Sequence, residues 1–127
     1  MKIFIDTADL SEIKEIASWG IIDGVTTNPS LLKKAVEKLQ ESGEKITIKD
    51  YIKKILTTAK GTPVSLEVTE TSAEGMINQA KKLYKIFNPV ADNVCIKIPV
   101  NPSFQDEKGK DFDGIKTIKT LSSFNIP

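Results

Sequence analysis

The sequence lacks histidine and arginine, two residue types that carry much of protein chemistry. It has no histidine, and all 18 basic residues are lysines. Without histidine, histidine-based catalytic triads and most zinc sites are excluded, so acid–base chemistry would fall to carboxylates, lysine, tyrosine or water. Without arginine, a phosphate site built from these residues would use lysine, backbone amides or hydroxyls instead of the bidentate guanidinium group.

Cysteine and long apolar runs are also scarce. Cys95 is the only cysteine, so no intrachain disulfide can form, which fits a reducing compartment. Its neighbours are apolar, and we interpret it as a small core residue, not a reactive thiol. No apolar run approaches the length of a membrane span, and the first one ends at Asp6, too early for a signal peptide. These absences predict a soluble, cytoplasmic protein.

Charge and length set further limits on what the chain does. The net charge is +1, so composition gives no reason to expect a nucleic acid or an anionic membrane as a partner. The 127 residues correspond to a single domain. A chain of this size can bury roughly two-thirds of the surface that its unfolded form exposes.

The apolar pattern predicts strands that alternate with helices. Short segments rich in β-branched residues predict four strands, near residues 2–6, 24–27, 64–69 and 94–100. Helical stripes follow each strand, and an additional helix is predicted over residues 50–59. The residues predicted to cap helices are Asp9, Ser30 and Thr71. Strands alternating with helices indicate parallel βαβ units.

The last part of the chain combines a polar segment with a final helix. Residues 101–111 are polar and are predicted to form a surface loop. The helix that follows is predicted to present Phe112, Ile115, Ile118 and Leu121 as one apolar face.

Lys97 lies in the middle of the fourth predicted strand, whose other residues are apolar. A strand of this composition is predicted to be buried on both faces. Burial disfavours the charged form of a lysine and lowers its pKa, and a neutral amine is a nucleophile toward carbonyls. The alternatives are that Lys97 reaches water from an edge strand or pairs with a carboxylate.

Further polar residues share the placement of Lys97. Side chains alternate between the two faces of a strand, so Asp6, Glu67 and Lys97 each lie opposite their strand's aliphatic residues and near its carboxyl end. Thr26 and Asn28 share one face of the second strand. In a barrel these residues would converge at the strand ends where active sites are built. The alternative is that the acids are ordinary strand-end residues and that Thr26 is a core residue.

Four short motifs carry these polar residues. They are FIDTA at residues 4–8, DGVTTNPS at 23–30, SLEV at 65–68 and IKIP at 96–99, and AEGM at 73–76 adds support. In these motifs the chain resembles the transaldolase family, in particular its small transaldolases and fructose 6-phosphate aldolases. The resemblance covers essentially the whole chain.

The resemblance implies a (β/α)8 barrel of TIM type and a class I mechanism that uses neither a metal nor an organic cofactor. Lys97 would form a Schiff base with a ketose phosphate and hold its dihydroxyacetone unit. Asp6 would be the general acid–base group of carbon–carbon cleavage, and Glu67 would act through a water in forming and resolving the imine. Asn28 would hydrogen-bond the carbon skeleton, and Thr26 would line the site. Aldolase members tend to carry glutamine at position 67, so glutamate favours a transaldolase.

The length departs from the family, whose barrels have about eight βα units. Residues 1–127 correspond to a single incomplete barrel domain of about four units. An Asn/Thr motif, an assisting aromatic residue and the phosphate-binding serine and arginine would lie beyond it, and the segment at 101–110 is longer than in compact members. A half barrel exposes its inner layer and two strand edges. We therefore expect a homo-oligomer, a partner carrying the C-terminal half, or a longer polypeptide.

Two functional hypotheses follow from the sequence. The first is transfer of a dihydroxyacetone unit between sugar phosphates in the pentose phosphate pathway. The alternative is a non-catalytic half barrel that needs a second chain or copy. A phosphate-binding module at the helix after Asn28 is a weaker idea, because no glycine-rich loop precedes that helix.

Overall fold

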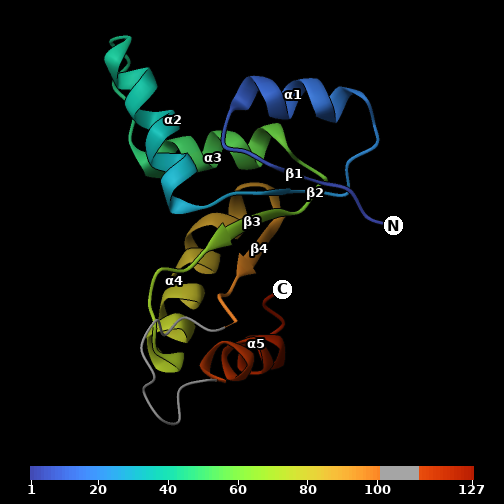
Figure 1. The fold of residues 1–127 in the computed structure, drawn as a ribbon, viewed down its shortest axis with the longest axis vertical. Coiled ribbons are helices and arrows are strands. Elements are labelled where there is room, and N and C mark those ends of the chain that lie inside the picture. Colours follow the sequence, from blue (N-terminus) through green and yellow to red (C-terminus); the bar gives the residue numbers. More distant parts are fainter. Residues whose placement is uncertain (101–111) are drawn as a thin grey trace.

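Four parallel strands and five helices form the part of the chain that the structure, a computed structural model, describes: residues 1–100 and 112–127 (Figure 1). In chain order they are β1 (Phe4–Asp6), α1 (Leu10–Ser18), β2 (Gly24–Thr26), α2 (Pro29–Glu41), α3 (Ile48–Thr58), β3 (Val64–Glu67), α4 (Ala73–Ala91), β4 (Val94–Lys97) and α5 (Asp113–Ser123). Each strand is shorter than the range expected from the sequence. The predicted surface loop at 101–111 lies outside the described residues.

The four strands form one sheet in the order β1-β2-β3-β4, and every neighbouring pair is parallel. Each strand connects to the next through helical segments, which is the α/β half-barrel pattern and confirms the predicted fold class. The register aligns Asp6 with Thr26, and Glu67 with Lys97. The candidate site residues of adjacent strands are therefore cross-strand neighbours.

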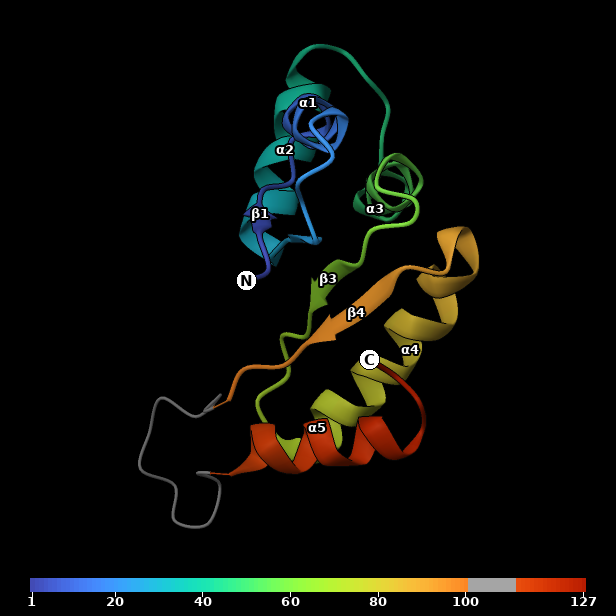
Figure 2. The ribbon, with the colours of Figure 1, turned by 90° about the vertical axis from the view of Figure 1, so that its right-hand side faces the viewer.

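The core lies between the sheet and the helices. On β3 and β4 the side chains of Val64, Leu66, Val94 and Ile96 are buried and belong to one hydrophobic cluster with residues of the helices. Figures 1 and 2 show α1 and α3 beside the first strands and α4 and α5 beside β3 and β4. Alternation places the remaining strand side chains on the opposite face of the sheet, which we call the open face.

β4 is buried on one face only, so the prediction of burial on both faces is wrong. The side chain of Lys97 remains 42% exposed on the open face. A continuous apolar run predicts a strand covered on both sides, but in a half barrel the inner side has no facing strands to cover it.

Helix starts depart from the predicted caps in two places. Asp9 caps α1 as predicted, accepting hydrogen bonds from the backbone amides of Ser11 and Glu12. Asn28, not Ser30, caps α2, because Pro29 is the first helical residue, a position that suits proline's fixed φ and missing N–H. Ser72, not Thr71, caps α4.

The helix predicted at residues 50–59 begins earlier than expected. It starts at Ile48, and the Thr47 side chain accepts a hydrogen bond from the Asp50 amide. The predicted start therefore lies inside the first turn of α3.

α5 packs with a different face from the predicted one. Phe112, Ile115 and Ile118 are 62%, 51% and 47% exposed, and only Leu121 of the predicted apolar face is buried. The buried side instead carries Asp113, Gly114 and Thr117. These residues make specific contacts described below, and those contacts set the rotation of the helix.

The end of the chain lies beside β4. The Ile96 amide donates a hydrogen bond to the Pro127 carbonyl at 2.7 Å, and Figure 2 shows the C-terminus between β4 and α5. Lys81 lies over the Phe124 ring, 3.6 Å from its centroid, which joins α4 to the end of α5. The outer edge of β4 is thus partly paired by the chain itself, whereas β1 is an edge strand of the described sheet.

Residues 1–100 and 112–127 lack two further features. None of the helices there combines the length and the apolar character that crossing a membrane requires. The same part of the chain also holds no group of three or more histidine, cysteine, aspartate or glutamate side chains placed to bind a metal ion.

Candidate active site

Lys97 and Glu67 form an ion pair at the carboxyl ends of β4 and β3. Lys97 Nζ lies 3.2 Å from Glu67 Oε2, and the two side chains are 42% and 24% exposed. The pair follows from the register, which places the two residues directly opposite each other. This contact matches one of the alternatives given for Lys97, pairing with a carboxylate.

Asp6 and Thr26 form a second pair, at the ends of β1 and β2. The Thr26 hydroxyl donates a hydrogen bond to Asp6 Oδ1 at 2.7 Å. The next residue, Thr27, points to the other face, where it is fully buried and donates to the Ser65 carbonyl at 2.7 Å. Adjacent threonines thus serve different faces, one holding a carboxylate and the other joining β2 to β3.

The two pairs share the open face but do not touch. Asp6 and Lys97 lie on strands that are three positions apart in the sheet. At about 4.8 Å per strand, that separation is roughly 14 Å along a flat sheet. Ser65 on β3 lies between the two pairs, opposite Thr26 on one side and Cys95 on the other. A ligand that joined both carboxylates to Lys97 would need this face to curve around it, as in a barrel.

Asn28 lies two residues after the end of β2 and is the N-cap of α2. Its side-chain carbonyl accepts a hydrogen bond from the Leu31 amide at 2.9 Å. The carbonyl is therefore occupied in positioning α2, and the amide NH2 is the part of Asn28 that can donate to a ligand.

Cys95 lies on the open face, not in the core as predicted. It is half-buried, and burial raises the pKa of the Cys95 thiol, opposed in part by a hydrogen bond to Ser65. A raised pKa keeps a thiol protonated at neutral pH and so unreactive. The raised pKa supports the interpretation of Cys95 as an inert thiol. The predicted location of Cys95 in the core was wrong.

Sequence reasoning missed the contact between Phe4 and Gly24 on this face. The ring lies across Gly24, where an added Cβ would come within 2.1 Å of a ring atom. Phe4 is 48% exposed, on the same side of β1 as Asp6. Alternation alone placed Phe4 beside Asp6, but only the structure shows that Gly24 makes room for the ring.

A groove beside Asp6 extends the site outward. Its volume is about 370 Å³, and it runs between the loop after β1 and the first turns of α2. Glu12, Lys34 and Lys38 contribute charges of both signs to its walls. Hydrogen bonds from the Ser11 side chain and amide hold the pKa of Asp9, also in this wall, below its usual value.

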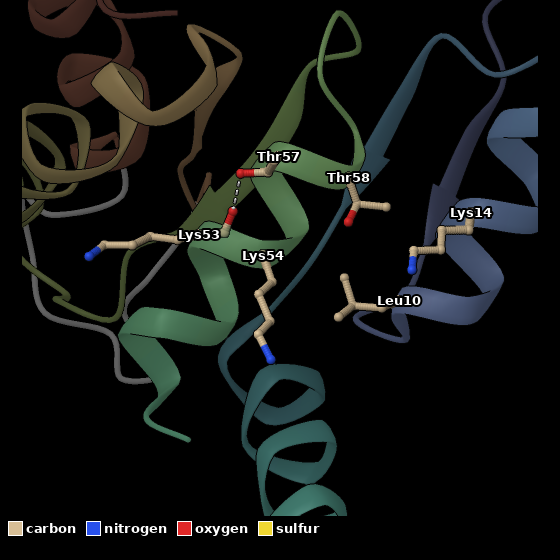
Figure 3. A pocket seen from close by; sticks show the side chains of 6 residues that line it. All are labelled: Leu10, Lys14, Lys53, Lys54, Thr57 and Thr58. Carbon is tan, nitrogen blue, oxygen red and sulfur yellow. Dashed lines mark hydrogen bonds between the residues drawn. The ribbon is translucent and has the colours of Figure 1, made fainter. Parts of the chain in front are cut away.

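A second groove, shown in Figure 3, lies on the helix layer between α1 and α3. Its volume is about 490 Å³, and its charged lining consists of Lys14, Lys53 and Lys54. Figure 3 shows Lys14 and Lys54 on the groove side, whereas Lys53 points away from it. The groove has no carboxylate in its lining, so it lacks the amine–acid combination found at the strand ends.

Comparisons with known proteins agree with the motifs. The family model described as transaldolase/fructose-6-phosphate aldolase matches residues 3–127. A protein named probable transaldolase from Thermoplasma acidophilum is 41% identical over 126 residues, which are 99% of this chain and 47% of the relative. Proteins of the same name from Kosmotoga olearia and Thermoplasma volcanium are 42% and 40% identical over the same share. The chain spans about half the length of the curated relatives it matches.

Proposed function

The chain belongs to the transaldolase/fructose-6-phosphate aldolase family, and from this we propose that it carries the Schiff-base half of a transaldolase site. The complete site would transfer a dihydroxyacetone unit between sugar phosphates of the pentose phosphate pathway. The observation that carries the proposal is the contact of 3.2 Å between Lys97 Nζ and Glu67 Oε2 at the strand ends. An amine nucleophile needs a nearby group to take its proton before it attacks a carbonyl.

Lys97 is the nucleophile in this proposal. The ammonium first gives up a proton, directly or through a water, to Glu67, and the amine then adds to the ketose carbonyl. Loss of water leaves a protonated imine, which is an electron sink for the bond to be broken. Glu67 returns and takes protons as the imine forms and is later resolved. Glutamate at position 67 favours a transaldolase, which passes the dihydroxyacetone unit to a second aldehyde, over an aldolase, which releases that unit.

Asp6 is the general acid–base group for cleavage. It takes the proton of the sugar hydroxyl next to the breaking carbon–carbon bond, the aldehyde leaves, and the electron pair moves into the imine to give an enamine. The reverse sequence with an acceptor aldehyde completes the transfer. The hydrogen bond from Thr26 holds Asp6 Oδ1 at 2.7 Å and leaves Oδ2 for the substrate. Asn28 donates from its NH2 group to the bound carbon skeleton.

In this proposal the remaining strands of the barrel, and with them the phosphate anchor, come from a second copy, a partner chain or a longer polypeptide. The chain contains no arginine, and it spans 47% of the relative from Thermoplasma acidophilum. The Pro127 carbonyl pairs with the Ile96 amide on the outer edge of β4. This bond occupies part of the edge at which the sheet of a barrel would continue.

Borohydride trapping tests this function. The protein is incubated with fructose 6-phosphate, reduced, digested and mapped by mass spectrometry. We expect one adduct with the mass of a reduced ketose phosphate or its dihydroxyacetone part, on Lys97. Lys97→Met should abolish it, and Lys33→Met should not, since Lys33 is an exposed lysine paired with Glu37 at 3.7 Å. An adduct that persists undiminished in Lys97→Met would refute the assignment.

A non-catalytic half barrel is the second candidate, and the exposure of Lys97 favours it. At 42% exposed, the lysine sits in solvent and not in a closed site, and water competes for each contact that orients a substrate. This candidate predicts no imine on the isolated chain and a defined oligomer or complex by size-exclusion chromatography with light scattering. A stable monomer that traps substrate on Lys97 would exclude it.

A further inference from the structure

We propose that the first turn of α5 is a positioning device for Lys97. In this inference Gly114, assisted by Asp113 and Thr117, sets the spacing between the strand ends that carry Lys97 and Glu67. The inference rests on the proposed role of Lys97 as the nucleophile. Its test, however, reads the reactivity of the lysine without any sugar substrate.

Gly114 lets α5 touch the backbone that follows Lys97. A Cβ atom added at Gly114 would lie 2.1 Å from the Pro99 carbonyl oxygen and 2.4 Å from the Val100 carbonyl oxygen. Both distances are far inside van der Waals contact, and the atoms belong to the backbone, which cannot swing aside as a side chain does. Only glycine permits this approach, and one residue, Ile98, separates the contacted segment from Lys97.

Asp113 and Thr117 attach the same turn to the start of α4. The Ala73 amide donates a hydrogen bond to Asp113 Oδ2 at 3.2 Å. The Thr117 hydroxyl donates to the Asp113 carbonyl at 2.8 Å and lies 3.4 Å from the Ala73 carbonyl. Asp113 and Thr117 are 8% and 0% exposed. Buried polar groups keep their geometry because leaving them unpaired is costly.

The start of α4 is in turn connected to Glu67. The Val68 amide, directly after Glu67, donates to the Lys97 carbonyl at 3.2 Å. The amides of Thr69 and Glu70 donate to Gln79 Oε1 on α4 at 2.8 and 3.0 Å. Hydrogen bonds therefore hold the first three residues after Glu67, and two of these residues are bonded to α4. One turn of α5 contacts the segments that follow both members of the Lys97–Glu67 pair.

The groups that surround Lys97 make this spacing chemically relevant. Glu67 on β3 is its carboxylate neighbour, Cys95 lies on its own strand, and Asp6 lies three strands away on the same face. The acid of the α5 turn, Asp113, is paired with Lys116 at 3.5 Å. An amine held 3.2 Å from a carboxylate must leave that contact before its nitrogen can attack a carbonyl. A change in the distance to Glu67 therefore changes the reactivity of Lys97.

The test measures how fast Lys97 is modified relative to Lys33. A short pulse of formaldehyde and borohydride methylates neutral amines, and peptide mass spectrometry reports each lysine. Lys33 is the internal reference because it also has a carboxylate partner, at 3.7 Å, but on the distant helix α2. In Gly114→Ala we expect the ratio of the Lys97 rate to the Lys33 rate to rise about two- to fivefold, the range for losing an exposed ion pair.

Ile115→Ala is the matched control. Ile115 directly follows Gly114 in the same turn of α5, but its side chain is 51% exposed. We expect the ratio to remain at the wild-type value. Glu67→Gln should raise the ratio by itself, and adding Gly114→Ala to it should give no further rise, because both changes act on one contact.

Thr117→Val keeps the inference testable if Gly114→Ala does not fold. Valine has the shape of threonine without the hydroxyl, so the ratio should rise, and Thr117→Ser, which keeps the hydroxyl, should restore it. An unchanged ratio in folded Gly114→Ala and Thr117→Val would overturn the inference. So would a Gly114→Ala effect of full size in the Glu67→Gln background. Failed sugar trapping on a wild-type chain whose ratio responds as expected would count against the proposed function alone.

Discussion

The two faces of the sheet differ in what determines their residues. The face toward the helices carries buried aliphatic side chains on β3 and β4, and its buried threonine, Thr27, bonds to the backbone. The open face carries Asp6–Thr26 and Glu67–Lys97 as two partly exposed polar pairs. We infer that packing determines the residue types of the helix-side face, whereas the proposed chemistry determines those of the open face. Substitutions on the first should therefore change stability, and substitutions on the second should change reactivity.

The largest expected effect comes from emptying the helix-side core. Ile55 on α3 is fully buried, and Ile55→Ala removes apolar contacts and leaves a cavity, which costs about 2–5 kcal/mol of unfolding free energy. Chemical denaturation followed by circular dichroism measures this loss. Phe4→Ala, on the open face and 48% exposed, should cost well under half as much. Equal losses would mean that the open face is packed like a core.

Adjacent threonines give a sharper comparison of the same kind. Thr27→Val removes a hydroxyl that donates to the Ser65 carbonyl at 2.7 Å in a fully buried position, and should lower the unfolding free energy by about 0.5–1.5 kcal/mol. Thr26→Val changes the same atoms on the open face and should alter stability less, while freeing the Asp6 carboxylate. A larger stability loss for Thr26→Val, measured by the same denaturation experiment, would reverse the assignment of the two faces.

The smallest expected effect is a pH dependence of stability that arises at the start of α1 and not on either face of the sheet. Hydrogen bonds from Ser11 lower the pKa of Asp9, the cap of α1, below the usual value of an aspartate. A lowered folded-state pKa contributes stability above the unfolded pKa, and this contribution is lost as pH falls through the folded value. Wild-type protein should therefore lose more stability between pH 5 and pH 2 than Asp9→Asn, which still caps the helix. Denaturation series at several pH values check this, and parallel curves would contradict it.

Sequence periodicity predicted the face on which each site residue lies, because alternation along a strand is a local property. The partners of those residues were not predictable in the same way. Glu67 pairs with Lys97, and Thr26 with Asp6, through the strand register, which depends on contacts between distant segments. The motif resemblance supplied the roles, and these stay proposals.

The errors of prediction arose where a distant contact outweighed a local pattern. The apolar stripe of α5 predicted a buried face with Ile115 and Ile118, yet that face is exposed because Gly114 packs against the Pro99 backbone and Asp113 binds the Ala73 amide. The exposure of Lys97 has a similar cause. Its apolar neighbours predicted a covered strand, but among the described residues no strand faces β4 across the open face.

Borohydride reduction in the presence of fructose 6-phosphate, followed by peptide mapping, decides whether Lys97 is the Schiff-base nucleophile. We predict that the reduced adduct lies on the peptide containing Lys97 and disappears in Lys97→Met. If an adduct forms on other lysines at the same level in both proteins, Lys97 is not the nucleophile.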